Sequence, residues 1–253
     1  MKWTKAQIDD FINAIHAGII DVHNLPKNLY KQIAKYLIDG VDKGFKEFDS
    51  KDADLLQQLR ENVYMFSSAK TYQQVKDIAG KITTDDGTLR PFNEFKKDAT
   101  QIFDEYNVNY LRTEYNTAIG QAAMASKWDI IQAQKDILPY LQYSTIGDAC
   151  DICAPLDGFT APVDDPAWDV IMPLNHFNCE CLVNQVDETD GKEVDDSGND
   201  ELVKTVSGKM DDTFKMNPGK DGYIFSPDHP YFVVPKDDRG FAKDNFGLPF
   251  STK

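Results

Sequence analysis

The sequence lacks any long apolar run, and this absence narrows the classes of protein it can belong to. No stretch approaches the ~18 consecutive apolar residues that a membrane-spanning helix needs. Asp9 and Asp10 lie where a signal peptide would have its apolar region. We therefore expect a protein that begins in the cytosol and has no membrane partner. With 253 residues, 41% of them hydrophobic, the chain has enough apolar side chains for a buried core, so wholesale disorder is excluded.

Basic charge is also scarce, above all in the second half of the chain. The whole sequence carries 27 Lys and Arg against 42 Asp and Glu, a formal charge of −15. Residues 1–140 have a net charge of −2 and residues 141–253 a net charge of −13. Duplex DNA is bound mainly by clustered Lys and Arg that neutralise phosphates. The charge therefore gives DNA contact no support, and any such contact would come from the first half.

Residues 1–138 carry apolar residues at helical spacing, and they predict one helix after another. Thr4 and Gln7 form a capping-box pattern at the first start. We expect the second helix to end near Gly44 or at the Asp49–Ser50 pair, and the longest helix to extend as far as Ile137. The predicted helix starts are Thr4, Pro26, Ser50, Thr71 and Pro91.

The composition changes near residue 138, because ten of the twelve prolines lie from Pro139 onward. Residues 140–144 and 181–186 alternate like short strands. Residues 187–201 carry eight acidic side chains and one lysine, which is typical of a solvated linker. The sequence thus predicts an α+β chain with a mainly α-helical region over 1–138, a small α+β module over 139–186, and an acidic linker followed by an extended arm with short strands over 187–253.

All four cysteines lie within 32 residues, and a histidine lies among them. The order is Cys150, Cys153, His176, Cys179 and Cys181. Two cysteines separated by two residues can hold a metal from a tight turn, and a second segment with His and Cys completes a structural zinc site. Two disulfides are the competing interpretation, but a cytosolic chain keeps its thiols reduced. We therefore expect a structural Zn²⁺.

Five potential ligands compete for the four positions of a tetrahedral zinc site. We favour Cys150, Cys153 and His176 with either Cys179 or Cys181, and an all-cysteine site is the alternative. In both cases the ligand set is full and leaves no position for a catalytic water. We therefore predict no catalytic residue, no further cofactor and no enzymatic activity.

Two classes of zinc enzyme have similar ligands, but the sequence lacks a further residue that each of them requires. A nucleobase deaminase needs a His-x-Glu element before its cysteine pair, which this chain lacks. A zinc-stapled nuclease needs a further histidine, whereas His176 is the only one in the cluster. One alternative hypothesis is nevertheless a metal-dependent nuclease or toxin that carries a structural zinc module, with its active site in residues 190–253. A small zinc-containing adaptor is another.

The combined pattern resembles the minor head proteins of tailed bacteriophages typified by the F protein of phage Mu. The resemblance covers about residues 111–186. In that family a helix with an Arg-Thr-Glu-like segment precedes an aromatic strand, an acidic residue just before a Cys-x-x-Cys knuckle, a Leu-x-Gly turn, a Trp, and a Pro-x-x-His-x-x-Cys-x-Cys finish. The matching residues are Arg112, Thr113, Glu114, Tyr143, Asp148, Cys150, Cys153, Leu156, Gly158, Trp168, Pro173, His176, Cys179 and Cys181.

The resemblance implies a structural role in phage head morphogenesis. The implied partners are the portal and other head proteins, to which the helical region over 1–138 would bind, and the implied location is the procapsid or virion after assembly in the host cytoplasm. One residue departs from the family pattern: Glu180 stands between the last two cysteines, where a basic residue is common. This acidic residue weakens any role of that turn in DNA contact.

Overall fold

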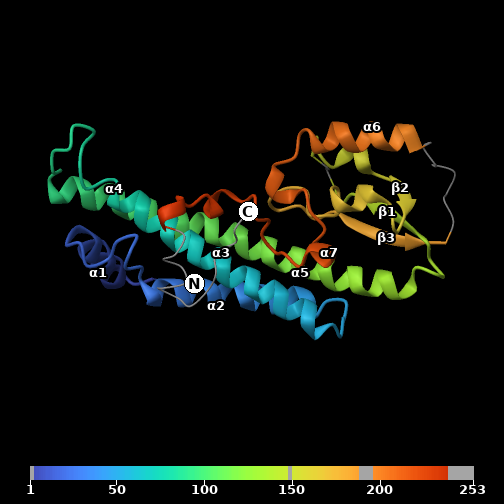
Figure 1. Ribbon diagram of the computed structural model, residues 1–253, viewed down its shortest axis with the longest axis horizontal. Helices are drawn as coiled ribbons and strands as arrows, with labels where there is room; N and C mark the ends of the chain where they lie inside the picture. Colours follow the sequence, from blue (N-terminus) through green and yellow to red (C-terminus); the bar gives the residue numbers. More distant parts are fainter. Residues whose placement is uncertain (1–2, 148–149, 188–195, 239–253) are drawn as a thin grey trace. The chain divides into compact units, whose positions relative to one another are not determined.

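The computed structural model describes residues 3–147, 150–187 and 196–238 (Figure 1). Helices dominate the first 134 residues. They are α1 (Lys5–His16), α2 (Lys27–Phe45), α3 (Ala53–Ala79), α4 (Phe92–Asp104), a π-helical segment η1 (Glu105–Tyr110) and α5 (Leu111–Gln134). In the described residues, no helix combines the length and apolar character required to cross a membrane. The α+β class predicted from the sequence, with its mainly helical first part, is confirmed.

The helix starts follow local capping chemistry, with two differences from the prediction. The capping box of Thr4 and Gln7 is present at α1. Asp52 rather than Ser50 caps α3, because its carboxylate accepts the N–H of Leu55 (2.8 Å). The predicted start at Thr71 is wrong: α3 continues through it, and the Thr71 hydroxyl donates to the carbonyl of Ser67. A threonine inside a helix satisfies its hydroxyl in this way instead of capping.

The long helix predicted after Pro91 is confirmed from Phe92 to Gln134. Its hydrogen bonds change from the α-helical to the π-helical pattern over Glu105–Tyr110. The π-helical turn η1 separates α4 from α5 without ending the helical path. Such single π turns occur often at functional positions. Tyr106 and Asn107 of this turn are buried, so the turn contributes side chains to the core.

A three-stranded antiparallel sheet follows the helices, in the order β2-β1-β3. Strands β1 (Tyr140–Ser144) and β3 (Leu182–Val186) confirm the predicted strands, whereas β2 (Thr160–Pro162) was not predicted. Leu141 and Tyr143 of β1 are fully buried and alternate with partly exposed neighbours. Three residues are too few for alternation to mark a strand such as β2.

The C-terminal part is more helical than predicted. Helix α6 spans Asp196–Ser207 and α7 spans Pro218–Asp221. Short 3₁₀ turns lie at η2 (Ala154–Leu156), η3 (Pro166–Asp169), η4 (Asp212–Phe214), η5 (Pro230–Phe232) and η6 (Lys236–Asp238). The described residues from 196 to 238 contain no strand, so the prediction of short strands in the arm is wrong there; residues 196–201, at the end of the predicted acidic linker, lie in α6. Side-chain caps such as Asn217 on α7 hold these short helical turns, which leave no periodic pattern in the sequence.

The chain forms two compact units, each assembled from separate stretches of sequence. Unit 1 contains residues 1–37, 63–115 and 230–253, and unit 2 contains residues 38–62 and 116–229. The ranges predicted from the sequence are continuous, whereas these units are not. In unit 1, the ring of Phe103 packs edge-on against Trp3 and Phe11. In unit 2, the sheet packs with residues of α5 and α6 around Trp168 in one apolar core.

Candidate metal centre

The first two cysteines lie on a tight turn between β1 and η2. The N–H of Ala154 donates to the carbonyl of Cys150 (2.8 Å), and the N–H of Leu156 donates to the carbonyl of Cys153 (2.9 Å). These bonds fold the Cys-x-x-Cys segment back on itself. Gly158 then has φ +75°, a conformation that favours glycine, and it turns the chain toward β2. The local sequence thus builds a knuckle that presents Cys150 and Cys153.

The second ligand segment precedes β3. The N–H of Cys179 donates to the carbonyl of His176 (3.2 Å), which closes a turn containing Asn178 at φ +58°. Asparagine tolerates this left-handed conformation better than most residues. Cys181 follows directly before the strand. A loop and a strand start therefore carry His176, Cys179 and Cys181.

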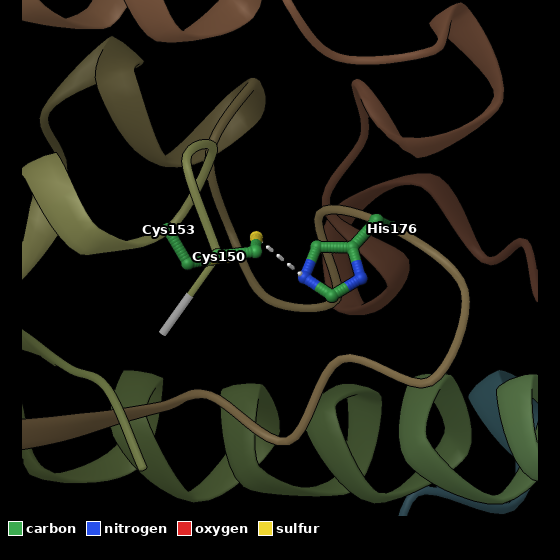
Figure 2. A group of neighbouring side chains, drawn as sticks. All are labelled: Cys150, Cys153 and His176. Atoms are coloured by element: carbon green, nitrogen blue, oxygen red, sulfur yellow. Dashed lines mark hydrogen bonds between the residues drawn. The ribbon is translucent and has the colours of Figure 1, made fainter. Parts of the chain in front are cut away.

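These two segments bring all five predicted ligand residues into two groups that share Cys153. The possible ligand atoms of Cys150, Cys153 and His176 lie within 4.8 Å of one another, and so do those of Cys153, Cys179 and Cys181. Figure 2 shows His176 directed at Cys150, with Nε2 3.1 Å from Sγ. The sulfur atoms of Cys153 and Cys179 are 3.9 Å apart. The residues predicted from the spacing are thus neighbours in space.

The two groups differ in their burial. Cys153, Cys179 and Cys181 are buried in the core of unit 2, while Cys150 is exposed and His176 is half-buried. All four cysteines are free thiols. The hydroxyl of Tyr143 lies 3.5 Å from Cys153 Sγ and 3.0 Å from the side-chain amide of Asn175. The polar cluster therefore has a buried inner side supported by Tyr143 and Asn175, and an outer side open to solvent.

The histidine ring has a contact that favours one tautomer. His176 Nδ1 lies 2.9 Å from the carbonyl oxygen of Phe177. A carbonyl only accepts, so Nδ1 carries the hydrogen and, in the neutral ring, Nε2 keeps its lone pair. Nε2 is also the atom that faces Cys150. A backbone carbonyl that fixes the ring in this way is a common outer partner of metal-binding histidines.

The buried thiols also influence one another's charge. The hydrogen bond with Cys179 raises the pKa of Cys153. Hydrogen bonds from Cys153 and Cys181 lower the pKa of Cys179. Burial raises the pKa of Tyr143, which keeps its hydroxyl protonated beside the sulfurs. The arrangement favours a negative charge on one sulfur, and a bound cation would neutralise that charge.

The donor set fits a soft or borderline metal ion. Four sulfur atoms and one imidazole nitrogen are ligands that Zn²⁺ accepts, and none is a hard oxygen. Zn–S bonds of about 2.3 Å in a tetrahedron place sulfur atoms about 3.8 Å apart. The separation of 3.9 Å between Cys153 and Cys179 is close to that value. The cluster could therefore bind a metal ion.

Other residues of the motif have structural positions. Trp168 is fully buried, and its Nε1 donates to the carbonyl of Pro162 (2.9 Å). Glu114 belongs to unit 1, where it pairs with the buried Lys70. Arg112 is exposed, and Asp148 lies outside the described residues. The motif thus combines core residues of both units with the candidate ligands of unit 2.

No sequence pattern assigned a role to Asn175 or Lys70, and Tyr143 was identified only as part of the motif. Asn175 and Tyr143 stand behind the cysteines, and the position of Asn175 next to His176 is a local hint of this arrangement. Lys70 is the one charged residue between Glu61 and Lys76. A solitary charge in such an uncharged helical stretch is a signal of burial that the periodicity alone does not give.

One comparison with known proteins gives a match. A family model described as phage Mu protein F like protein matches residues 31–184. The matched range is more than half of the chain, and it extends from α2 into β3 and includes all five candidate ligands. No curated protein and no solved structure matches the chain.

Proposed function

Because the chain belongs to the phage Mu protein F like family and is thus a phage head morphogenesis protein, we propose that it is a minor structural head protein of a tailed bacteriophage or prophage. The observation that carries this proposal is the family match itself. That match spans helices of both units together with the Cys/His cluster, so it does not rest on the cysteine spacing alone. The family is structural, and the proposed role requires no catalysis.

The proposed partners are the portal and other head proteins, and the proposed location is the procapsid and the virion, reached from the host cytoplasm. The low content of basic residues, with only four arginines, favours protein partners over DNA. Glu180, between the last two cysteines, is exposed and adds negative charge to the turn. This charge supports a position against protein rather than nucleic acid.

We further propose that four of the five clustered side chains hold one structural Zn²⁺. Cys153 belongs to both groups of donors, so it is part of every plausible set. Three of the other candidates, His176, Cys179 and Cys181, come from the segment before β3. An ion held by Cys153 and that segment would fix the knuckle against the start of the strand. Its binding energy would then contribute directly to the folding of this part of unit 2.

The test of the head role is quantitative mass spectrometry of purified procapsids and virions from the source phage or induced prophage. The chain is counted against the portal protein in each particle. A few copies per portal ring are expected. Absence from both kinds of particle would overturn the proposal, and nuclease or toxicity assays of the full chain would then test the alternative enzyme function.

A matched pair of variants tests whether incorporation into particles depends on the metal site. Particles are produced with the wild-type chain, with Cys153→Ser, and with Glu180→Gln. The serine variant should be depleted from particles, because it loses the shared ligand, whereas Glu180→Gln should be incorporated like the wild type. Equal incorporation of all three would show that assembly does not depend on the metal site.

A further inference from the structure

Unit 1 contains a fully buried ion pair that the proposed head role does not use. Lys70 on α3 and Glu114 on α5 are 0% and 3% exposed, and Lys70 Nζ lies 2.8 Å from Glu114 Oε1. Burial lowers the pKa of Lys70 and raises that of Glu114, against the attraction between the two groups. Taking two charges out of water costs several kcal/mol per ion, and the attraction often fails to repay that cost.

The C-terminal segment 230–238 closes over this pair. The hydroxyl of Tyr231 lies 3.4 Å from Lys70 Nζ, and the Tyr231 ring lies beneath the ammonium at 5.0 Å from its centroid. Tyr106 contributes a second ring at 5.1 Å and stacks on Tyr231 with ring centroids 5.7 Å apart. Cation–π contacts of this kind stabilise a lysine that has lost its water. Tyr231 is thus the residue of the segment that contacts the buried pair directly.

A small set of side chains holds the rest of the segment on α3. Gln73 Nε2 donates to the carbonyls of Tyr231 (3.1 Å) and Val233 (2.9 Å), and the Tyr72 hydroxyl donates to Asp238. The ring of Phe66 packs against those of Tyr231 and Phe232. Val233 is 72% exposed, and Lys236 and Asp237 are exposed as well. Side chains rather than a ladder of backbone hydrogen bonds therefore provide the attachment.

We propose that residues 230–238 form a releasable strap, whose opening returns water to the Lys70–Glu114 pair and exposes the face of α3 around Phe66. The solvation that the two charges recover offsets part of the free energy needed to detach Tyr231 and its neighbours from α3. The strap therefore opens as a local unit while the helices beneath it stay folded. This inference rests on neither the metal centre nor the proposed head role.

Native-state hydrogen exchange of the full chain tests the strap. The reporters are the N–H groups of Val233, Val234 and Asp238, which donate to carbonyls within the strap. They should exchange at least about tenfold faster than the interior amides of α3, at a rate insensitive to low denaturant. Exchange of strap and α3 amides at one common rate would overturn the proposal.

Hydrogen exchange of two variants distinguishes a releasable strap from a segment that is only part of the fixed packing. Gln73→Ala, which removes two hydrogen bonds, should speed strap exchange about tenfold and leave the interior of α3 unchanged, with Gln57→Ala on the same helix as its control. The triple variant Lys70→Met, Glu114→Leu, Tyr231→Phe replaces the buried charges by apolar groups and should slow strap exchange by at least about threefold. Faster exchange in the triple variant, or no effect of Gln73→Ala, would refute the releasable strap.

Discussion

Cys153 and Cys179 lie 26 residues apart in the sequence, yet their sulfur atoms are 3.9 Å apart inside the apolar core of unit 2. The knuckle after β1 carries the first and the turn before β3 carries the second. A buried pair of free thiols at this separation offers two neighbouring corners of a metal tetrahedron. The relationship makes Cys153 the central residue of the candidate site, since it also lies beside Cys150 and His176.

The first prediction compares how much the buried and the exposed ligands contribute to zinc affinity. Cys153→Ser should lower the affinity for Zn²⁺ at least about 100-fold, because it removes the sulfur shared by both groups. Cys150→Ser should cost less, since Cys150 is exposed at the outer side of the cluster, where a water molecule has room to replace it. Competition with a chromophoric chelator on the full-length proteins measures both affinities, and elemental analysis gives the stoichiometry.

The same experiment identifies the fifth residue. Single substitutions of His176, Cys179 and Cys181 complete the series, and the residue whose loss leaves the affinity unchanged is not a ligand. Wild-type protein that copurifies with no zinc, and binds none when it is added under reducing conditions, would contradict the metal site.

The second prediction concerns the packing of α2 against α5 in unit 2. A Cβ on Gly44 would lie 2.0 Å from the carbonyl oxygen of Ile119 and 3.0 Å from the N of Ala123. Gly44→Ala should therefore lower the free energy of unfolding by about 2 to 3 kcal/mol, although alanine is the better helix former. Urea denaturation followed by circular dichroism measures this loss.

Gly80 provides the control for that substitution. A Cβ there meets only the carbonyl oxygens of Lys76 and Asp77 at 3.4 and 3.6 Å, which are ordinary distances. Gly80→Ala should change the free energy of unfolding by no more than about 0.5 kcal/mol. If the two substitutions lowered the free energy of unfolding equally, the close approach of Ile119 to Gly44 would not be the cause of the loss.

The third prediction is a pH dependence in unit 1. Burial, helped by the neighbouring Tyr64, raises the pKa of Tyr30 to about 12. The folded state thus holds the phenol proton more tightly than the unfolded state, whose tyrosine has a pKa of about 10. Tyr30 therefore adds stability below pH 10, and that contribution is lost as the pH rises from 10 through about 12.

Comparison of the wild type with Tyr30→Phe measures this dependence. Phenylalanine has no proton to lose, so between pH 10 and 12 its unfolding free energy should fall less steeply, by up to about 1.4 kcal/mol per pH unit. Tyr64→Phe serves as the second variant, since it removes only the smaller contribution to the shift. Parallel stability curves for Tyr30→Phe and the wild type would contradict the assignment to Tyr30.

Much of the fold could be predicted because it depends on local patterns. The capping box at Thr4, the strand over Tyr140–Ser144 and the helical path from Phe92 to Gln134 each have a signal within a few residues. The cysteine spacing likewise identified five neighbours in space. The prediction of a helix start at Thr71 was wrong because the residue types that cap a helix can also donate to carbonyls within one.

What escaped prediction depends on residues far apart in the sequence. Two units that interleave along the chain have no signature in composition, and the pairing of Lys70 with Glu114 joins positions 44 residues apart. Tyr143 and Asn175 support the cysteines from different segments. Hydrophobic periodicity shows which face of a helix is buried, but not which polar group it meets there.

The fourth prediction tests one of these distant interactions, between α3 and the segment before the strap. Asn62 is 3% exposed, and its Oδ1 accepts the N–H groups of Ile224 (3.0 Å) and Phe225 (2.9 Å). Its Nδ2 donates to the carbonyl of Phe225 (2.9 Å). One amide side chain therefore hydrogen-bonds to three backbone groups of a segment that has no regular secondary structure.

Asn62→Ala removes these three hydrogen bonds inside unit 2, where a buried polar group that loses its bond costs about 1 to 3 kcal/mol. We expect a loss of about 3 kcal/mol in unfolding free energy and faster hydrogen exchange at Ile224 and Phe225. Asn62→Asp keeps the acceptor but puts a carboxylate oxygen against the carbonyl of Phe225 and buries a charge, so its loss should be at least as large as that of Asn62→Ala. Gln57→Ala, which removes only a bond to Glu61 on the surface of the same helix, is the control, and an equal effect of Asn62→Ala and this control would contradict the role of Asn62.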